Sequence, residues 1–180
     1  MSQFKIDGFI LSVNDLYTWI NGFITLYRKD KLKRVHLPHD AAVGRAFDYE
    51  QSSSANGWIP LGAGVYPKHF ALPADADGKR LLLEFEGVYR DAQVWVNGRY
   101  LGRHLNGYIG FEHDITEPAV CGGDNVVTVT YDNRKPHTSR WYTGEGMYRD
   151  VWLKIVDALH VPLHGTFVTT PCVSASARCA

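Results

Sequence analysis

The residues best suited to chemistry lie in one stretch, 132–147, where Arg140, Trp141 and Tyr142 stand side by side. Arginine presents a planar pair of hydrogen-bond donors, and the two aromatic rings present flat apolar faces. Such a set can donate hydrogen bonds to sugar hydroxyls while a ring stacks on the C–H face of the sugar. The same rings could equally close the end of a β-sandwich, so both interpretations stay open. Glu145 adds a carboxylate to this candidate site.

His39 and Asp40 are a second candidate pair. Pro38 precedes them, and proline ends regular strand pairing because it has no backbone N–H to donate. We therefore expect both side chains on a loop. They are typical either of a hydrogen-bonded loop anchor or of a catalytic dyad. We place them with the 140–145 stretch as candidates for a sugar-binding site or an active-site mouth.

Catalytic and metal-binding motifs are absent from the sequence. It has no Gly-x-Ser-x-Gly elbow, no phosphate loop, no His-Glu-x-x-His and no catalytic cysteine context. Glu84 and Glu86 alternate with apolar neighbours, which indicates the solvated face of a strand. The eight histidines are scattered, and the three cysteines have no zinc-like spacing. We predict no catalytic residue, no metal and no cofactor in this chain.

The clearest structural signal is a hairpin centred on Asn97-Gly98. Both residue types tolerate positive φ, as a two-residue type I′ turn requires, so 94–96 and 99–101 are predicted to be antiparallel strands. The arm Val94-Trp95-Val96 has no polar face. We therefore expect it to be buried on both sides.

Other segments repeat the strand pattern. Residues 81–86, 125–131 and 149–156 alternate apolar and polar side chains, and Asn21-Gly22 could turn a second hairpin within 16–27. Residues 66–72 indicate a strand that Pro67 confines to an edge or a bulge, and 45–64 is a long loop of the kind that is usually functional or mobile. No segment keeps a helical period over three turns. These observations predict an all-β sandwich or barrel.

Composition excludes some functions. Lys plus Arg and Asp plus Glu number 19 each among 180 residues, and this balance argues against a nucleic-acid partner. No apolar run approaches the ~18 residues of a membrane span, and the first 30 residues lack a convincing cleavage site. We expect a soluble protein with no membrane partner, in the cytoplasm.

Several short motifs resemble, in their order and spacing, one known family. They are Leu37-Pro38-His39-Asp40, Phe85-Glu86-Gly87-Val88-Tyr89, Val94-Trp95-Val96-Asn97-Gly98, Gly107-Tyr108, Phe111, Ser139-Arg140-Trp141-Tyr142, Gly144, Gly146, Tyr148-Arg149 and Val151-Trp152-Leu153. Each is weakly specific, but their ordered succession is a strong signal. The chain resembles, over roughly residues 35–158, the N-terminal sugar-binding domain of glycoside hydrolase family 2, with bacterial β-galactosidases as the nearest group.

The resemblance implies a galactose-binding-domain-like jelly roll, then an immunoglobulin-like sandwich, then a (β/α)₈ barrel with both catalytic glutamates. Such a barrel needs ~250 residues. The retaining pair of carboxyl groups, ~5–5.5 Å apart, therefore cannot be assembled from this chain. The implied partners are a β-galactoside-like carbohydrate and the missing immunoglobulin-like and barrel domains of the same enzyme.

The sequence also departs from the family pattern. The family often has an aromatic residue at Val65 and a basic one at Pro67, so strand pairing is in doubt there. Some β-galactosidases place an acidic residue of this domain near the sugar or a bound cation. The matching stretch holds Ser139-Arg140 and no acid, so the resemblance predicts no metal by that route.

Two domains are predicted, a sugar-binding β-sandwich at 1–160 and, at 161–180, a linker with the first strand of an incomplete second domain. Three functions follow from these observations. The first is the N-terminal module of a β-galactosidase-like hydrolase, which shapes the active-site mouth and is inactive alone. The second is a stand-alone carbohydrate-binding module, and the third is a scaffold without sugar contact. The predicted strand within 166–180, which has no partner strand, favours the first, because we expect a free-standing binder to close its domain.

Overall fold

In the part of the chain that the structure describes, the regular secondary structure is almost all β-strand. The computed structural model describes residues 2–6, 9–13, 17–20, 23–26, 33–50, 52–135 and 142–171. Within these ranges the helical segments are two single-turn 3₁₀ helices, η2 Ser54–Asn56 and η3 Ala74–Ala76. The strands are β1 Ser2–Ile6, β2 Phe9–Val13, β3 Tyr17–Ile20, β4 Phe23–Leu26, β5 Lys33–Val35, β6 Ala63–Ala71, β7 Arg80–Phe85, β8 Ala92–Val96, β9 Arg99–His104, β10 Phe111–Asp114, β11 Asp124–Asp132 and β12 Val151–Val156.

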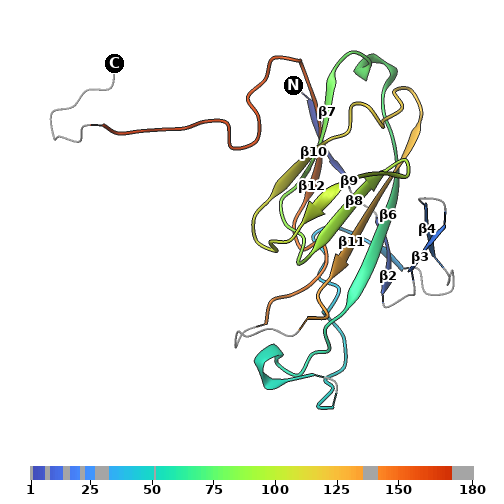
Figure 1. Ribbon diagram of the computed structural model, residues 1–180, viewed down its shortest axis with the longest axis vertical. Coiled ribbons are helices and arrows are strands. Elements are labelled where there is room, and N and C mark those ends of the chain that lie inside the picture. The colour runs from blue at the N-terminus through green and yellow to red at the C-terminus, as the bar shows by residue number, and fades with distance from the viewer. Residues whose placement is uncertain are drawn as a thin grey trace.

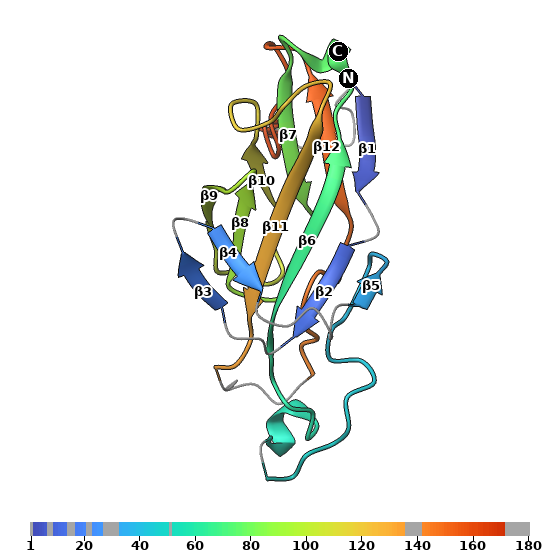
Figure 2. The same cartoon turned by 90° about the vertical axis from the view of Figure 1, so that its right-hand side faces the viewer.

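Two antiparallel sheets lie face to face (Figures 1 and 2). One has the strand order β1-β12-β7-β10 and the other β5-β2-β6-β11-β8-β9. From β6 onward the chain passes back and forth between them: β7, β10 and β12 belong to the four-stranded sheet, and β6, β8, β9 and β11 to the six-stranded one. This winding is that of a jelly-roll sandwich, which confirms the predicted fold class.

Period-2 alternation explains how the two sheets make one core. In β11 the side chains of Val127, Val129 and Tyr131 are buried, while the intervening positions keep some solvent contact. Leu83 and Phe85 of β7 supply the facing layer from the other sheet and are fully buried. Apolar burial of this kind contributes ~25 cal/mol per Å², so the alternating residues hold the two sheets together.

The Asn97-Gly98 hairpin forms as predicted. Val96 pairs with Arg99, and the two turn residues have φ values of 50° and 80°. The Asn97 side chain also ties the turn to β11, because its Oδ1 accepts a hydrogen bond from the Val126 N–H at 2.8 Å. Trp95 is 3 % exposed, which confirms that this arm is buried.

The outer face of β7 differs from its prediction. Glu84 and Glu86 do point away from the core, but they are partly buried and paired rather than freely solvated. The Lys154 ammonium of β12 lies 2.6 Å from a Glu84 carboxylate oxygen, and the Trp152 indole N–H donates to Glu86 at 2.9 Å. The alternating pattern correctly predicts that Glu84 and Glu86 point away from the core. It does not predict their partners, which lie on another strand.

Two further strand predictions are confirmed. β3 pairs antiparallel with β4, with Ile20 opposite Phe23, as expected for a hairpin at 16–27; the turn residues Asn21 and Gly22 lie outside the described residues. Figures 1 and 2 place this hairpin on the outer side of the six-stranded sheet. In β6, Pro67 pairs with Thr128 of β11, and β2 reaches only Gly64 and Val65. Pro67 therefore occupies an edge, where its missing N–H costs no ladder bond.

Beyond β12 the chain leaves the sandwich (Figure 1). Residues 157–171 contain no strand in the part that the structure describes, and Phe167 and Val168 are largely exposed. The start of a second domain at 161–180 therefore stays a prediction. Among the described residues, no helix has the length and apolar character needed to cross a membrane.

Candidate functional site

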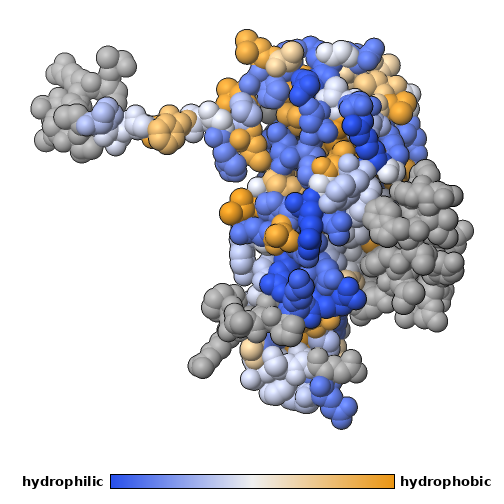
Figure 3. All heavy atoms as spheres, in the orientation of Figure 1, coloured by the Kyte–Doolittle hydropathy of each residue, from blue (hydrophilic) through white to orange (hydrophobic). Residues whose placement is uncertain are grey.

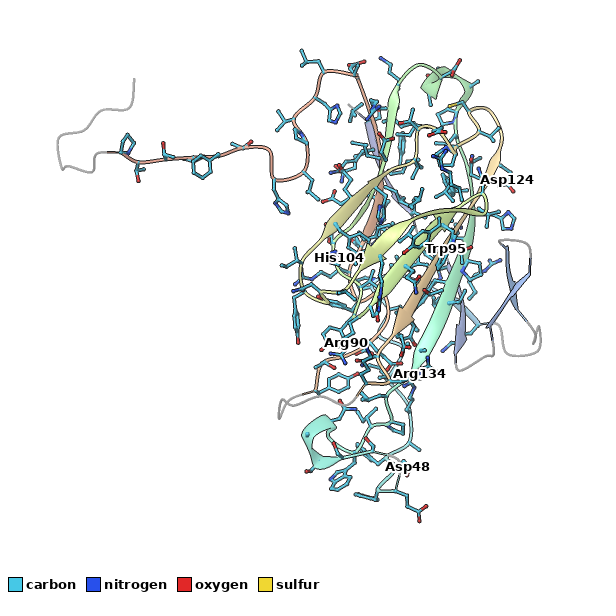
Figure 4. The ribbon with its side chains drawn as sticks, in the orientation of Figure 1. Asp48, Arg90, Trp95, His104, Asp124 and Arg134 are labelled. Atoms are coloured by element: carbon cyan, nitrogen blue, oxygen red, sulfur yellow. The ribbon has the colours of Figure 1, made fainter. Side chains whose placement is uncertain are left out.

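One end of the sandwich, which we call the loop end, carries the candidate residues. It consists of residues 36–50, 52–62, 86–91, 105–110 and 142–150, which connect strands that start or finish there. Figure 4 shows Arg90 and Arg134 at this end and Asp48 at its far tip, while Asp124 lies toward the opposite end. Loops on a rigid scaffold are where binding side chains are usually placed.

Asp40 and Tyr142 are brought together although 102 positions separate them. The Tyr142 hydroxyl donates to Asp40 Oδ2 at 2.6 Å. The other carboxylate oxygen, Oδ1, accepts from the backbone N–H of Ala42 at 2.9 Å and of Glu145 at 3.1 Å. Three donors thus fix the carboxylate, and burial, followed by the bond to Asp40, raises the pKa of the Tyr142 phenol. Tyr142 remains 43 % exposed, so this pair faces solvent.

Glu145 lies beneath that pair and is fully buried. Its Oε1 accepts from the Tyr131 hydroxyl at 2.9 Å and forms an ion pair with Arg45, while Oε2 accepts from the Gly62 N–H at 2.8 Å. A buried carboxylate needs such partners because desolvation of a lone charge is costly. Both of its oxygens are engaged inside the protein, so Glu145 acts on the site by holding its base.

Arg45, Tyr131 and Gly62 were not among the predicted site residues. Arg45 also donates to the Pro60 carbonyl at 2.8 Å, which joins the two ends of the 45–62 loop, and its ion pair with Glu145 fastens that loop to the sandwich. Burial, and then the negative charge of Glu145, raises the pKa of Tyr131, which keeps the phenol neutral. Tyr131 reads as an ordinary core position of β11, and its partner is remote in sequence. No local signal could have identified this group.

His39 serves as an anchor at the start of the loop. Its Nδ1 lies 3.1 Å from the Tyr66 hydroxyl, and its backbone N–H donates to the Met147 carbonyl at 2.8 Å. Burial and the positive charge of Lys33 lower the pKa of His39, against a smaller opposing effect of Asp40. His39 and Asp40 therefore engage different partners, Tyr66 and Tyr142, which is the hydrogen-bonded anchor arrangement.

Gly144 and Gly146 allow the two chain segments to approach. Their φ values are 67° and 88°. A Cβ atom at Gly144 would lie 2.9 Å from Asp40 Oδ2, and one at Gly146 would lie 2.2 Å from the Tyr66 hydroxyl. Glycine is required at both positions for two reasons. The backbone is left-handed, and there is no space for a Cβ atom.

Four of the six candidate residues, His39, Asp40, Tyr142 and Glu145, therefore meet at the loop end. The other two, Arg140 and Trp141, lie outside the described residues. No group of three or more metal-ligating side chains occurs in the described ranges. What the arrangement offers is a half-exposed ring beside a fixed carboxylate, on a rigid base. That geometry suits binding of a hydroxyl-bearing ligand.

Comparison with known families agrees with this description. Residues 51–156 match the family described as "Glycosyl hydrolases family 2, sugar binding domain". The chain belongs to this family, and the part described by the match is its sugar-binding domain.

Similar proteins are much longer than this chain. It is 41 % identical over 138 residues to "Beta-galactosidase BoGH2A" of Bacteroides ovatus, which covers 76 % of this chain and 16 % of that protein. It is 32 % identical over 143 residues to a "Putative beta-glucuronidase" of Formosa agariphila, covering 77 % and 13 %. The crystal structure of a family 2 member from Bacteroides cellulosilyticus superposes with a TM-score of 0.83 at 32 % identity, covering 97 % of this chain and 23 % of that one. The chain thus spans less than a quarter of each.

Proposed function

We propose that this chain is the N-terminal sugar-binding module of a β-galactosidase-like family 2 enzyme and forms one wall of its sugar-binding mouth. The observation that carries the proposal is the Asp40–Tyr142 pair, a carboxylate held by three donors beside a half-exposed ring at the loop end. Asp40 would accept a hydrogen bond from a sugar hydroxyl, and the Tyr142 ring would pack against the sugar.

The remaining candidate residues take supporting parts in this proposal. Glu145 and Arg45 hold the base of the site, and His39 anchors the chain as it enters the loop. Arg140 and Trp141 precede Tyr142 and would add a planar donor and a second stacking ring. Cleavage of the glycosidic bond would be carried out by two carboxylates of a barrel domain. That barrel and an immunoglobulin-like domain, in the remainder of the enzyme, are the proposed partners, with a β-galactoside as the ligand.

A titration of the 180-residue chain with galactose, followed by amide NMR shifts, tests the proposal. So few contacts predict a dissociation constant no better than millimolar, about −4 kcal/mol. The shifts should map to 39–45 and 142–147, and Asp40→Asn should weaken binding about tenfold because a neutral amide is a poorer acceptor than a carboxylate.

Asp124→Asn is the matched control, since Asp124 is an exposed acid at the opposite end whose partner is His69. It should leave galactose affinity unchanged. Micromolar binding would instead favour a stand-alone carbohydrate-binding module. Absence of saturable shifts, or equal affinities of wild type and Asp40→Asn, would exclude the proposed site.

A further inference from the structure

Aromatic side chains are exposed at the tip of the loop end, away from the Asp40–Tyr142 pair. Phe47 is 64 % exposed and Tyr49 is 70 % exposed. The Trp58 ring lies beside that of Tyr49, with centroids 5.1 Å apart and planes inclined at 51°. In Figure 3 the tip is mostly pale, the colour of intermediate hydropathy, and Figure 4 places Asp48 there. Exposed aromatic groupings of this kind mark interaction sites.

The tip is held in one conformation by its own hydrogen bonds. The Asp48 N–H donates to the Trp58 carbonyl at 2.8 Å, and the Trp58 N–H donates to the Ser53 carbonyl at 3.0 Å. The Ser52 hydroxyl donates to the Ile59 carbonyl at 2.7 Å. At its base the loop is fastened by Arg45, as described above. A ligand would meet rings already in place, which reduces the entropy lost on binding.

Trp58 has an unusual backbone for a bulky residue. Its φ is 61°, in the left-handed region, directly after Gly57, whose φ is also 61°. A bulky non-glycine residue in this region costs of order 1 kcal/mol or more, and it persists only where the surrounding structure holds it there. The backbone at Trp58 therefore helps to place the indole beside Tyr49.

The charges around the rings indicate the class of ligand. Asp48 and Glu50 flank Tyr49, and Arg45 is neutralised by Glu145. Carboxylates next to flat apolar rings suit neutral sugars, whose hydroxyls donate hydrogen bonds while their C–H faces stack. An anionic ligand would be repelled. A protein interface would have few charged residues at its centre.

We propose that Tyr49 and Trp58, together with Phe47, form a second sugar subsite, which binds the distal units of a neutral β-linked oligosaccharide. This inference rests on the proposed function, because the end unit of the same oligosaccharide would lie at Asp40 and Tyr142. It assigns to the module a preference for chains of several sugars over single sugars.

Calorimetric titration of the 180-residue chain tests the inference. The probes are the β-1,4-linked tetrasaccharides of galactose, glucose, mannose and xylose, each compared with its monosaccharide. At least one tetrasaccharide should bind about tenfold more tightly than its monosaccharide, the equivalent of ~1.4 kcal/mol. Tyr49→Ala should abolish that gain and leave monosaccharide affinity unchanged. Phe47→Ala should reduce the gain, which provides a second variant.

Tyr100→Ala is the matched control, because Tyr100 on β9 is 50 % exposed and should leave the gain intact. The inference is overturned if no tetrasaccharide exceeds its monosaccharide or if Tyr49→Ala keeps the gain. It is also overturned if Tyr49→Ala lowers the melting temperature and both affinities together, since Tyr49 would then be structural. If Asp40→Asn weakens galactose binding but Tyr49→Ala does not change the affinity gain of the tetrasaccharide over the monosaccharide, this inference alone is rejected. A length gain that depends on Tyr49, together with a monosaccharide affinity that Asp40→Asn leaves unchanged, would support the subsite and reject the proposed function.

Discussion

The Glu145 carboxylate is the residue on which the geometry of the loop end depends. It joins the 45–62 loop, β11 and the 142–150 segment through Arg45, Tyr131 and Gly62, with no solvent contact of its own. Breaking a buried ion pair leaves the remaining charge desolvated, which typically costs about 3–5 kcal/mol. The lower end of this range applies because the Arg45 side chain keeps some exposure. Glu145→Gln should therefore lower the free energy of unfolding in urea by ~3 kcal/mol.

The matched control is Arg99→Gln. Arg99 also pairs with a carboxylate, that of Glu117 at 2.6 Å, but both side chains are more than half exposed. Exposed pairs of this kind contribute little because water screens them. Urea unfolding of Arg99→Gln should match that of wild type. A Glu145→Gln variant as stable as Arg99→Gln would show that the Arg45–Glu145 pair does not hold the loop end.

At the scale of elements, β8 is the strand with the least tolerance for change. Val94 and Val96 enter the core between the sheets, and Trp95, on the opposite face, is 3 % exposed. Removing a buried indole costs ~3–5 kcal/mol, against a total of ~5–15 kcal/mol for a typical domain. Trp95→Ala should leave the chain barely folded, with a greatly reduced melting temperature by circular dichroism.

Tyr100→Ala on the neighbouring strand provides the comparison. Its ring contacts that of Trp95, with centroids 5.3 Å apart, but half of its surface is exposed. Because the folded protein buries less apolar area at Tyr100 than at Trp95, Tyr100→Ala should lower the melting temperature much less than Trp95→Ala does. If the two variants melted alike, the outer face of β8 would contribute no more than the exposed edge of the sheet.

Local patterns in the sequence were sufficient for β8, β9 and β11. The Asn97-Gly98 turn needs only two residue types with positive φ, and the alternation of β11 needs only its own residues. The site depends on different information. Arg45 meets Glu145 across 100 positions, and Tyr142 meets Asp40 across 102, so no window of sequence contains either pair. Gly144 and Gly146 belong to the motifs that resemble the family, but their close approach to Asp40 and Tyr66 becomes visible only in three dimensions.

At the scale of the whole molecule, two histidines link stability to pH. Burial, and then the charge of His104, lowers the pKa of His113 below its ordinary 6.5. The pKa of His39 is lowered too, mainly by burial. His113 lies on β10, at the edge of the four-stranded sheet, and its ring contacts Phe111, which is itself stacked on His104 of β9. His39 lies at the loop end, so acid acts on both the core and the site.

The sign of the effect follows from these directions. When the folded pKa of a histidine lies below the unfolded value, the unfolded chain binds the proton first as the pH falls. The free energy of unfolding should therefore be constant from pH 8 to 7 and decrease as the pH falls below about 6.5. A second decrease should follow near pH 4 and below, because hydrogen bonds from Arg134 lower the pKa of Asp132 and its protonation removes them.

Urea unfolding at intervals from pH 8 to 5 measures the first of these decreases. His113→Gln has no proton to gain in this range, so its stability should depend less on pH than that of wild type, whatever its stability at pH 8. If His113→Gln and wild type lost stability in parallel, proton uptake at His113 would not be what couples the sandwich to pH. The coupling would then belong to His39 and the loop end, where His39→Gln should flatten the same curve.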